Sequence, residues 1–141
     1  MIARAEFSYP TNMARSRHRQ ELGHRGEAEA LHFLETRGYT LIAKNYRSPY
    51  GEIDLIVRDP RRQHMLVVVE VRTNSDPRFG DPLESVNSHK QRQVAKTAQY
   101  YVVTRGLEQS EVRFDVIGIR WDRGQARINH IQSAFELPRS W

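Results

Sequence analysis

Residues 52–72 read EIDLIVRDPRRQHMLVVVEVR, two apolar stretches joined by a short polar segment that contains a proline. The second stretch, residues 66–71, is apolar and mostly β-branched apart from Glu70. A run of this kind is typical of a central strand that is covered on both faces of a sheet. We therefore expect strands over 52–58 and 66–71, joined as a hairpin, in the middle of the fold.

The flanking segments predict an α/β domain. Apolar residues recur with helical spacing from residue 21 until Gly38, and again after the 73–82 loop until about residue 105. Strand-like segments complete the pattern at 39–47, 112–121 and 126–131. The order of helix, three strands, helix and two strands predicts a mixed five-stranded sheet flanked by helices.

Length and composition exclude several classes of protein. A chain of 141 residues fits one domain, here 21–137, after a basic, flexible N-terminal arm over 1–20 and before a tail over 138–141. The absence of Cys excludes disulfides, Cys-based zinc sites and a thiol nucleophile. Because no apolar run approaches the roughly 18 residues of a membrane helix, and no signal peptide is evident, we expect a soluble cytoplasmic protein without membrane contact.

The net charge of +5 is concentrated at the N-terminus. Residues 1–20 hold four Arg and one Glu, a local charge of +3, which leaves +2 for the rest of the chain. Such an arm is common at nucleic-acid contacts, although many solvated tails have the same composition.

Glu70 needs a partner, because a carboxylate buried in an apolar strand is costly unless something compensates its charge. If the hairpin turns at about Arg62, residue numbers in each cross-strand pair sum to 124. Asp54 then lies opposite Glu70, with Cβ atoms roughly 5 Å apart, and Glu52 lies opposite Arg72. Two facing carboxylates are stabilised either by neighbouring cations or by a divalent metal ion.

Two further charged residues are expected to face the sheet. Glu27 lies on the apolar stripe of the first helix, and Lys90 lies on that of the second. Ser88 is a candidate N-cap, which would put Lys90 in the first turn, where an anion is needed nearby. Alternatively, the helix begins nearer Ser85 and Lys90 is an ordinary amphipathic side chain.

Asp54, a gap of 15 residues and then Glu70-Val71-Arg72 resemble the PD-(D/E)xK nuclease signature. The surrounding residues 21–137 resemble the YraN family, small bacterial proteins with a restriction-endonuclease-like fold akin to archaeal Holliday-junction resolvases. The segments that carry this resemblance are Gly26-Glu27 with Ala30 and Leu34, Asn45-Tyr46-Arg47, the GEIDLI run at 51–56, Val69–Arg72, Phe79-Gly80, Lys90 and Arg113–Val116.

The resemblance implies metal-dependent hydrolysis of phosphodiester bonds in DNA, on branched or otherwise structured substrates. Asp54, Glu70 and the main-chain carbonyl of Val71 would bind Mg²⁺ or Mn²⁺, with Glu27 as a further ligand or water-orienting acid. Arg72 and Lys90 would stabilise charge on the phosphate. A homodimer would suit a substrate that is cut on two strands.

Arg72 departs from the family pattern, which has Lys at this position. Because Arg stays protonated, it cannot take a proton from water. The first alternative function is therefore a catalytically inactive nucleic-acid-binding module of the same fold. The second is a partner-binding protein whose acidic cluster is paired internally.

The remaining polar residues favour ordinary roles. The six His show no metal-binding spacing, and we expect His24 and His32 to lie on the surface. Asp115 is two residues from Arg113 on a predicted strand, so an ion pair between them is favoured over a role near the metal.

Overall fold

The computed structural model describes residues 11–74 and 82–136. Its elements follow the predicted order of helix, three strands, helix and two strands, with one additional 3₁₀ helix. They are α1 (Thr11–Thr36), β1 (Thr40–Ser48), β2 (Gly51–Asp59), β3 (Arg62–Asn74), the 3₁₀ helix η2 (Pro82–Ser85), α2 (Ser88–Thr104), β4 (Glu111–Asp122) and β5 (Gln125–Phe135). None of the helices in these ranges is long and apolar enough to cross a membrane.

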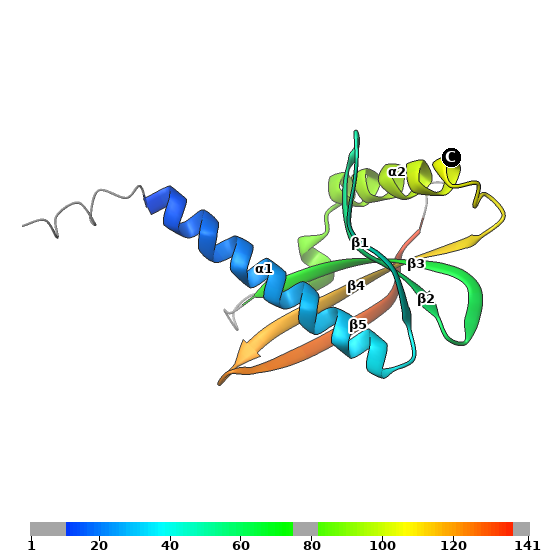
Figure 1. Cartoon of the computed structure of the whole chain (residues 1–141). Coiled ribbons are helices and arrows are strands. Elements are labelled where there is room, and N and C mark those ends of the chain that lie inside the picture. The colour runs from blue at the N-terminus through cyan, green and yellow to red at the C-terminus, as the bar shows by residue number, and fades with distance from the viewer. Residues whose placement is uncertain (1–10, 75–81, 137–141) are drawn as a thin grey trace, which may run out of the picture.

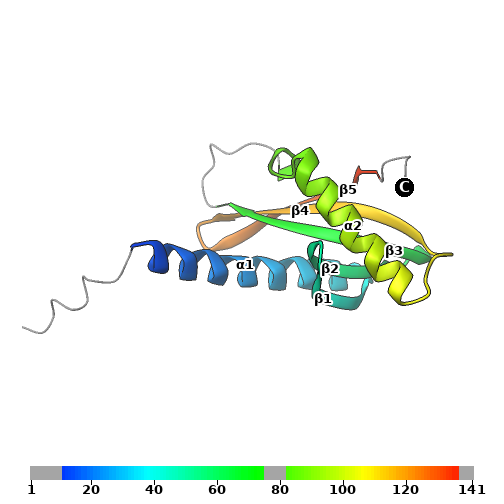
Figure 2. The same ribbon diagram turned by 90° about the horizontal axis from the view of Figure 1, so that it is seen from above.

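The five strands form one mixed sheet in the order β1-β2-β3-β4-β5. All neighbouring pairs are antiparallel except β3 and β4, which are parallel because η2 and α2 carry the chain back across the sheet. Helix α1 runs along one face of the sheet and α2 crosses the other face (Figures 1 and 2). The predicted mixed five-stranded sheet flanked by helices is confirmed.

Strand β3 is covered on both faces, as its sequence predicts. Val67 and Val69 belong to the apolar cluster that includes Ala30 and Leu34 of α1. Leu66 and Val68 belong to a second cluster with Val94, Ala95 and Ala98 of α2. Because side chains alternate along a strand, Glu70 continues the series that faces α2, and its side chain is 3% exposed.

The hairpin of β1 and β2 separates from β3 towards its tip (Figure 1). The paired residues of β2 and β3 run from Asp59↔Arg62 to Leu55↔Val69, whereas β1 and β2 stay paired as far as Ser48↔Gly51. The tip instead contacts α2, where Ser48 Oγ donates to Thr97 Oγ1 at 3.4 Å. Asp54 therefore lies at the point where the sheet opens.

The structure corrects two helix boundaries. Helix α1 begins at Thr11 and not near residue 21, so half of the predicted arm, 11–20, is helical backbone. Residues 1–10 lie outside the described ranges, as do the tail over 138–141 and Phe79-Gly80. Helix α2 begins at Ser88, but its N-cap is Asn87, whose Oδ1 accepts a hydrogen bond from the amide of Lys90 at 2.9 Å. Lys90 thus lies in the first turn of α2, and Ser88 is not the cap.

Gly118 of β4 fixes the position of η2. A Cβ at this position would overlap the ring of Pro82. We expect Gly118→Ala to lower the free energy of unfolding by about 1–3 kcal/mol, because the stiff ring has to move. Urea unfolding of Gly118→Ala, Pro82→Ala and the double variant tests this contact. The double variant should regain part of the loss, and a Gly118→Ala protein as stable as the native one would contradict the prediction.

Candidate functional site

Asp54 and Glu70 meet where β2 leaves β3. The pairs Leu55↔Val69 and Ile56↔Val68 follow the predicted sum of 124, and the same register brings Asp54 next to Glu70 just beyond the last pair. There the side chain of Asp54 takes the place of a strand carbonyl, because its Oδ2 accepts the amide hydrogen of Val71 at 2.8 Å. The predicted register is confirmed as far as Leu55↔Val69, and just beyond it the side chain of Asp54 takes over from the main-chain ladder.

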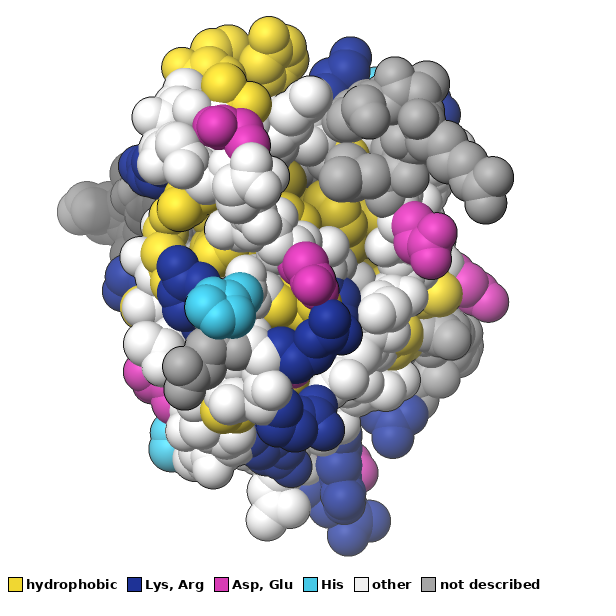
Figure 3. Space-filling view, turned by 90° about the vertical axis from the view of Figure 1, so that its right-hand side faces the viewer, with side chains coloured by type: hydrophobic (Ala, Val, Ile, Leu, Met, Phe, Trp, Pro, Cys, Tyr) yellow, Lys and Arg dark blue, Asp and Glu magenta, His cyan; other side chains and the backbone are white. Residues whose placement is uncertain are grey.

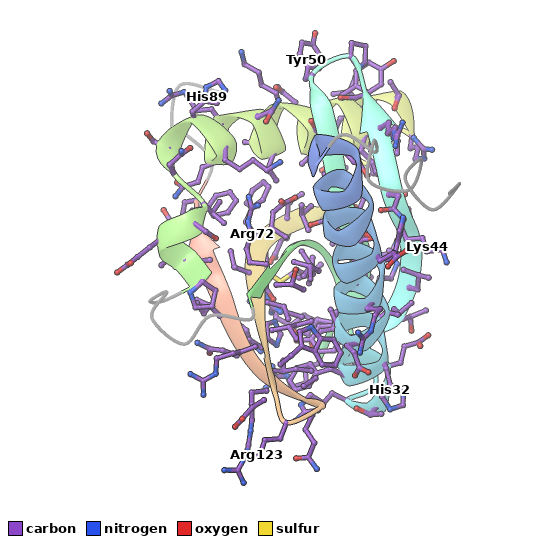
Figure 4. The ribbon with its side chains drawn as sticks, turned by 90° about the vertical axis from the view of Figure 1, so that its left-hand side faces the viewer. His32, Lys44, Tyr50, Arg72, His89 and Arg123 are labelled. Atoms are coloured by element: carbon purple, nitrogen blue, oxygen red, sulfur yellow. The ribbon has the colours of Figure 1, made fainter. Side chains whose placement is uncertain are left out.

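The cations near Glu70 hold it only loosely. Lys90 Nζ lies 3.8 Å and Arg72 Nη2 lies 3.9 Å from Glu70 Oε2. Both distances exceed the roughly 3.2 Å limit of a good hydrogen bond. Figure 4 shows Arg72 near the end of β3, on the side towards α2. The expected cationic partners of Glu70, Arg72 and Lys90, are therefore present, but both ion pairs are long and weak.

Two buried atoms of this site have no hydrogen-bond partner within the described part of the chain. They are Glu70 Oε1, an acceptor, and Arg72 Nε, a donor. Unpaired buried polar atoms are rare in folded proteins, because each loses its hydration without replacement. The unpaired oxygen of Glu70 can bind a positively charged group of a ligand, and the unpaired N–H of Arg72 can bind a negatively charged one.

Burial raises the pKa of both facing acids. Loss of solvent is the main cause for Glu70, and the negative charge of Asp54 adds to it, so that its pKa rises to about 8. The pKa of Asp54 is also raised, mainly by burial, although its bond from Val71 and the charges of Lys90 and Arg72 oppose the shift. The negative charges of the Asp54 and Glu70 carboxylates are thus only partly compensated in this buried site.

Glu27 faces this pair from α1. It is half-buried, and both loss of solvent and the charge of Asp54 raise its pKa. The side chain of Asn45 makes a hydrogen bond to the Glu27 carboxylate. Asn45 has a φ of +51°, a left-handed conformation that Asn tolerates better than most residues. The sequence motif contained Asn45, but its bond to Glu27 could not be read from spacing.

Glu52 is not opposite Arg72, as the simple hairpin register predicts. It pairs instead with Arg47 of β1, at 3.6 Å between Nε and Oε2, because the hairpin tip has left β3. Within 11–74 and 82–136, no group of three or more His, Asp or Glu side chains is arranged to hold a metal ion. The donors that the fold brings together are two carboxylates, with the main chain of Val71 beside them.

A second set of buried acids, at the other end of the strands, is fully compensated. Arg113 Nη1 donates to Asp59 Oδ2 at 2.7 Å, and its Nε and Nη2 donate to the two oxygens of Asp115, both at 2.9 Å. The pKa of Asp59 is lowered by hydrogen bonds from the Arg61 amide and from Arg113, and that of Asp115 by hydrogen bonds with His130 and Arg113; in both acids these bonds outweigh the effect of burial. The prediction that Asp115 pairs with Arg113 is confirmed. Among the buried acids of the described residues, loose pairing is therefore a property of Glu70.

His130 is a residue that sequence reasoning missed. Its Nε2 lies 2.8 Å from Asp115 Oδ2, and its side chain is 9% exposed. His24 and His32, by contrast, are exposed as expected. The only available signal was the alternation of Arg113 and Asp115 on a buried strand, which indicates a polar network but does not identify a partner 15 residues away.

Comparisons place this chain among related sequences. The model of "Uncharacterised protein family UPF0102" matches residues 26–119. A UPF0102 protein of Thermodesulfovibrio yellowstonii is 42% identical over 83% of this chain and 97% of its own length, and one of Persephonella marina is 39% identical over 82% and 93%. A solved structure of Pyrococcus furiosus SfsA in complex with Ca²⁺ aligns with 77% of this chain and 60% of its own at a TM-score of 0.33 and 10% identity, a likeness too small for inference.

The raised pKa of Glu70 predicts that stability falls as pH rises. Between its ordinary value of 4.5 and about 8, the folded state keeps a proton that the unfolded chain has released. The free energy of unfolding should therefore decrease by up to about 1.4 kcal/mol per pH unit across this window. Urea unfolding at several pH values should show this decline.

Glu70→Gln should flatten the decline, because its side chain is neutral at every pH. Glu111→Gln is the matched control, since Glu111 is exposed and pairs with Arg62 at 2.7 Å. The control should keep the native slope. An equal slope in the native protein and Glu70→Gln would show that the pKa of Glu70 is not raised.

Proposed function

The chain belongs to the UPF0102 family, also called the YraN family, and we propose that it is a metal-dependent nuclease that hydrolyses phosphodiester bonds in DNA. The observation that carries the proposal is the under-compensated pair of Asp54 and Glu70, with one buried carboxylate oxygen that has no partner among the described residues. The same protein pairs its other buried acids closely with Arg113, so the unpaired oxygen of Glu70 is a local property of this site.

The residues present fit a hard divalent cation. Mg²⁺ and Mn²⁺ prefer oxygen donors, and Asp54, Glu70 and the carbonyl of Val71 would supply them. With Asp54, Glu70 and Glu27 all ionised, as metal binding requires, three carboxylates against two cations (Arg72 and Lys90) give a local charge of −1, which a divalent ion would change to +1. When bound, such an ion polarises the phosphate and lowers the pKa of water.

Lys90 and Arg72 would face the phosphate. Lys90 lies in the first turn of α2, where the helix dipole favours anions. Arg72 has an Nε without a partner in the described ranges, which could meet a phosphate oxygen. Both cations would stabilise the negative charge that grows on the phosphate as water attacks and the bond to the leaving oxygen breaks.

Glu27 is the remaining carboxylate, and we assign it to the attacking water. Arg72 stays protonated and cannot accept the proton. Glu27 has a raised pKa, which makes a carboxylate a better acceptor, and Asn45 holds it in place. This assignment gives the departure from Lys at position 72 a chemical consequence, because the base must come from another element of the fold.

The alternative is a nucleic-acid-binding module without hydrolysis. It is favoured by Arg72, which stands where the nuclease pattern has Lys and lies within 3.9 Å of Glu70. In that case the acids and cations would remain partners of one another, and the basic residues of 1–20 would supply most of the affinity. A homodimer stays a prediction for substrates that need two cuts.

Cleavage of labelled duplex, single-stranded, flapped and four-way DNA tests the proposal. We expect cutting in Mg²⁺ or Mn²⁺ and none in EDTA. Asp54→Asn and Glu70→Gln should each reduce the rate at least about a hundredfold, because several kcal/mol of charge stabilisation are removed. Asp122→Asn is the control, since this exposed acid at the end of β4 pairs with Arg127, at 3.8 Å, away from the site.

Failure to cut any substrate, with binding that weakens as salt rises, would favour the binding module. Arg72→Lys separates the two functions further. If the chain is an active nuclease, this variant keeps activity, whereas gain of cutting only in Arg72→Lys would show that Arg72 has ended catalysis.

The basic N-terminal segment should contribute to DNA affinity. Deletion of 1–20 removes four Arg and one Glu, whereas deletion of 1–10 removes one of each and no net charge. The longer deletion should weaken binding and flatten the dependence of log K on log salt by about 0.9 for each phosphate that the protein no longer neutralises. The shorter deletion should change neither, and equal slopes for the two would contradict a role for this segment.

A further inference from the structure

A pocket of about 460 Å³ lies at the end of the sheet away from Asp54 and Glu70. The C-terminal end of α1, the turn between β2 and β3, and β5 form its walls. Asp59, at this end of β2, is the fifth residue after Asp54, which corresponds to about 17 Å of strand. The pocket is therefore distinct from the proposed catalytic site, and the inference below does not depend on nuclease activity.

The inner walls of the pocket are aromatic. The ring of His130 packs edge-on against Phe33, with centroids 5.9 Å apart, and against Tyr39, at 6.1 Å. Gln132, the next lining residue on this strand face, donates its amide to the hydroxyl of Tyr39 at 3.4 Å. Flat rings beside an amide that both donates and accepts suit a planar heterocycle with polar edges.

The rim of the pocket is cationic. Arg61 is 70% exposed, and Arg37 is held with its guanidinium 3.7 Å from the centroid of the Phe33 ring. Figure 3 views the side towards which the β2–β3 turn points, and Lys and Arg side chains gather over the middle and lower part of this face. A guanidinium group can donate two parallel hydrogen bonds to the oxygens of one phosphate, so the rim suits a phosphate.

The buried network behind the pocket holds these walls in place. Arg113 Nη2 donates to the Tyr39 hydroxyl at 3.1 Å, and Asp115 holds Nε2 of His130. Two carboxylates, Asp59 and Asp115, lie near three Arg, those at 37, 61 and 113, so these five side chains carry a net charge of +1.

We propose that this pocket binds a nucleoside monophosphate unit. The base would lie among the rings of Phe33, Tyr39 and His130, with Gln132 at its edge, and the phosphate would meet Arg37 and Arg61. Inorganic phosphate alone would leave most of the 460 Å³ empty, whereas pockets of this size commonly hold ligands of nucleotide size. The unit comes either from a free nucleotide or from the end of a nucleic-acid strand.

Calorimetric titration of the full chain in EDTA tests the pocket apart from any metal-dependent site. The probes are AMP, adenosine, inorganic phosphate and a 5′-phosphorylated tetranucleotide. AMP should bind at least about tenfold more tightly than adenosine or phosphate, because only AMP fills both halves of the pocket. Tighter binding of the tetranucleotide than of AMP would identify a strand end as the source, and the reverse would identify the free nucleotide.

Arg37→Gln and Arg61→Gln should each weaken AMP binding about tenfold, the usual cost of one charge-assisted hydrogen bond. Both side chains are exposed, so the fold should survive, as thermal unfolding would verify. Arg62→Gln is the control, since its neighbour Arg61 lines the pocket and Arg62 pairs with Glu111 instead. Dissociation constants above about 1 mM for both AMP and the tetranucleotide would overturn the proposal, as would unchanged affinity in the two variants.

Discussion

The fold depends on one strand that is buried on both faces and still carries a carboxylate. Alternation along β3 sends Val67 and Val69 to α1, and Leu66 and Val68 to α2, so Glu70 must enter the layer under α2. Its carboxylate loses water there, which raises its pKa, and Lys90 of the first turn of α2 lies 3.8 Å away. The hairpin of β1 and β2 leaves β3 at the same point, so the ladder between β2 and β3 ends there. The side chain of Asp54 accepts the hydrogen bond of the Val71 amide in place of a main-chain carbonyl of β2. The opening of the sheet and the acidic site thus have the same origin, the departure of β2 from β3.

The two ends of the sheet treat buried acids in opposite ways. At one end, Arg113 contacts Asp59 and Asp115 at 2.7 and 2.9 Å, and the pKa of each acid falls. At the other end, the cations remain nearly 4 Å from Glu70, and the pKa rises. Close ion pairs fix the side chains of buried acids, whereas loose ion pairs leave part of their charge uncompensated and able to bind a ligand. The contrast within one molecule is the main reason for placing chemistry at Glu70 and a structural network at Arg113.

Helix α1 connects the two regions. Glu27 faces Asp54, and Phe33, six residues further along the same helix, lines the pocket near Arg37. A rise of 1.5 Å per residue puts these positions about 9 Å apart along the helix axis. A strand of nucleic acid is long enough to contact both. The proposed roles of the two regions are therefore compatible with one polyanionic ligand, although each stands on its own geometry.

The sequence alone determined the order of the elements, the mixed sheet and the hairpin register, because apolar periodicity and strand alternation are local properties. The same register predicts that Asp54 and Glu70 are neighbours. Only the tertiary structure decided the start of α1, since residues 11–20 lack apolar periodicity and continue a helix that is already nucleated by 21–36. It likewise decided that Glu52 pairs with Arg47, that His130 contacts Asp115, and that three separate segments line one pocket. Each of these depends on how distant segments pack, and the spacing of residues along one chain carries no measure of that.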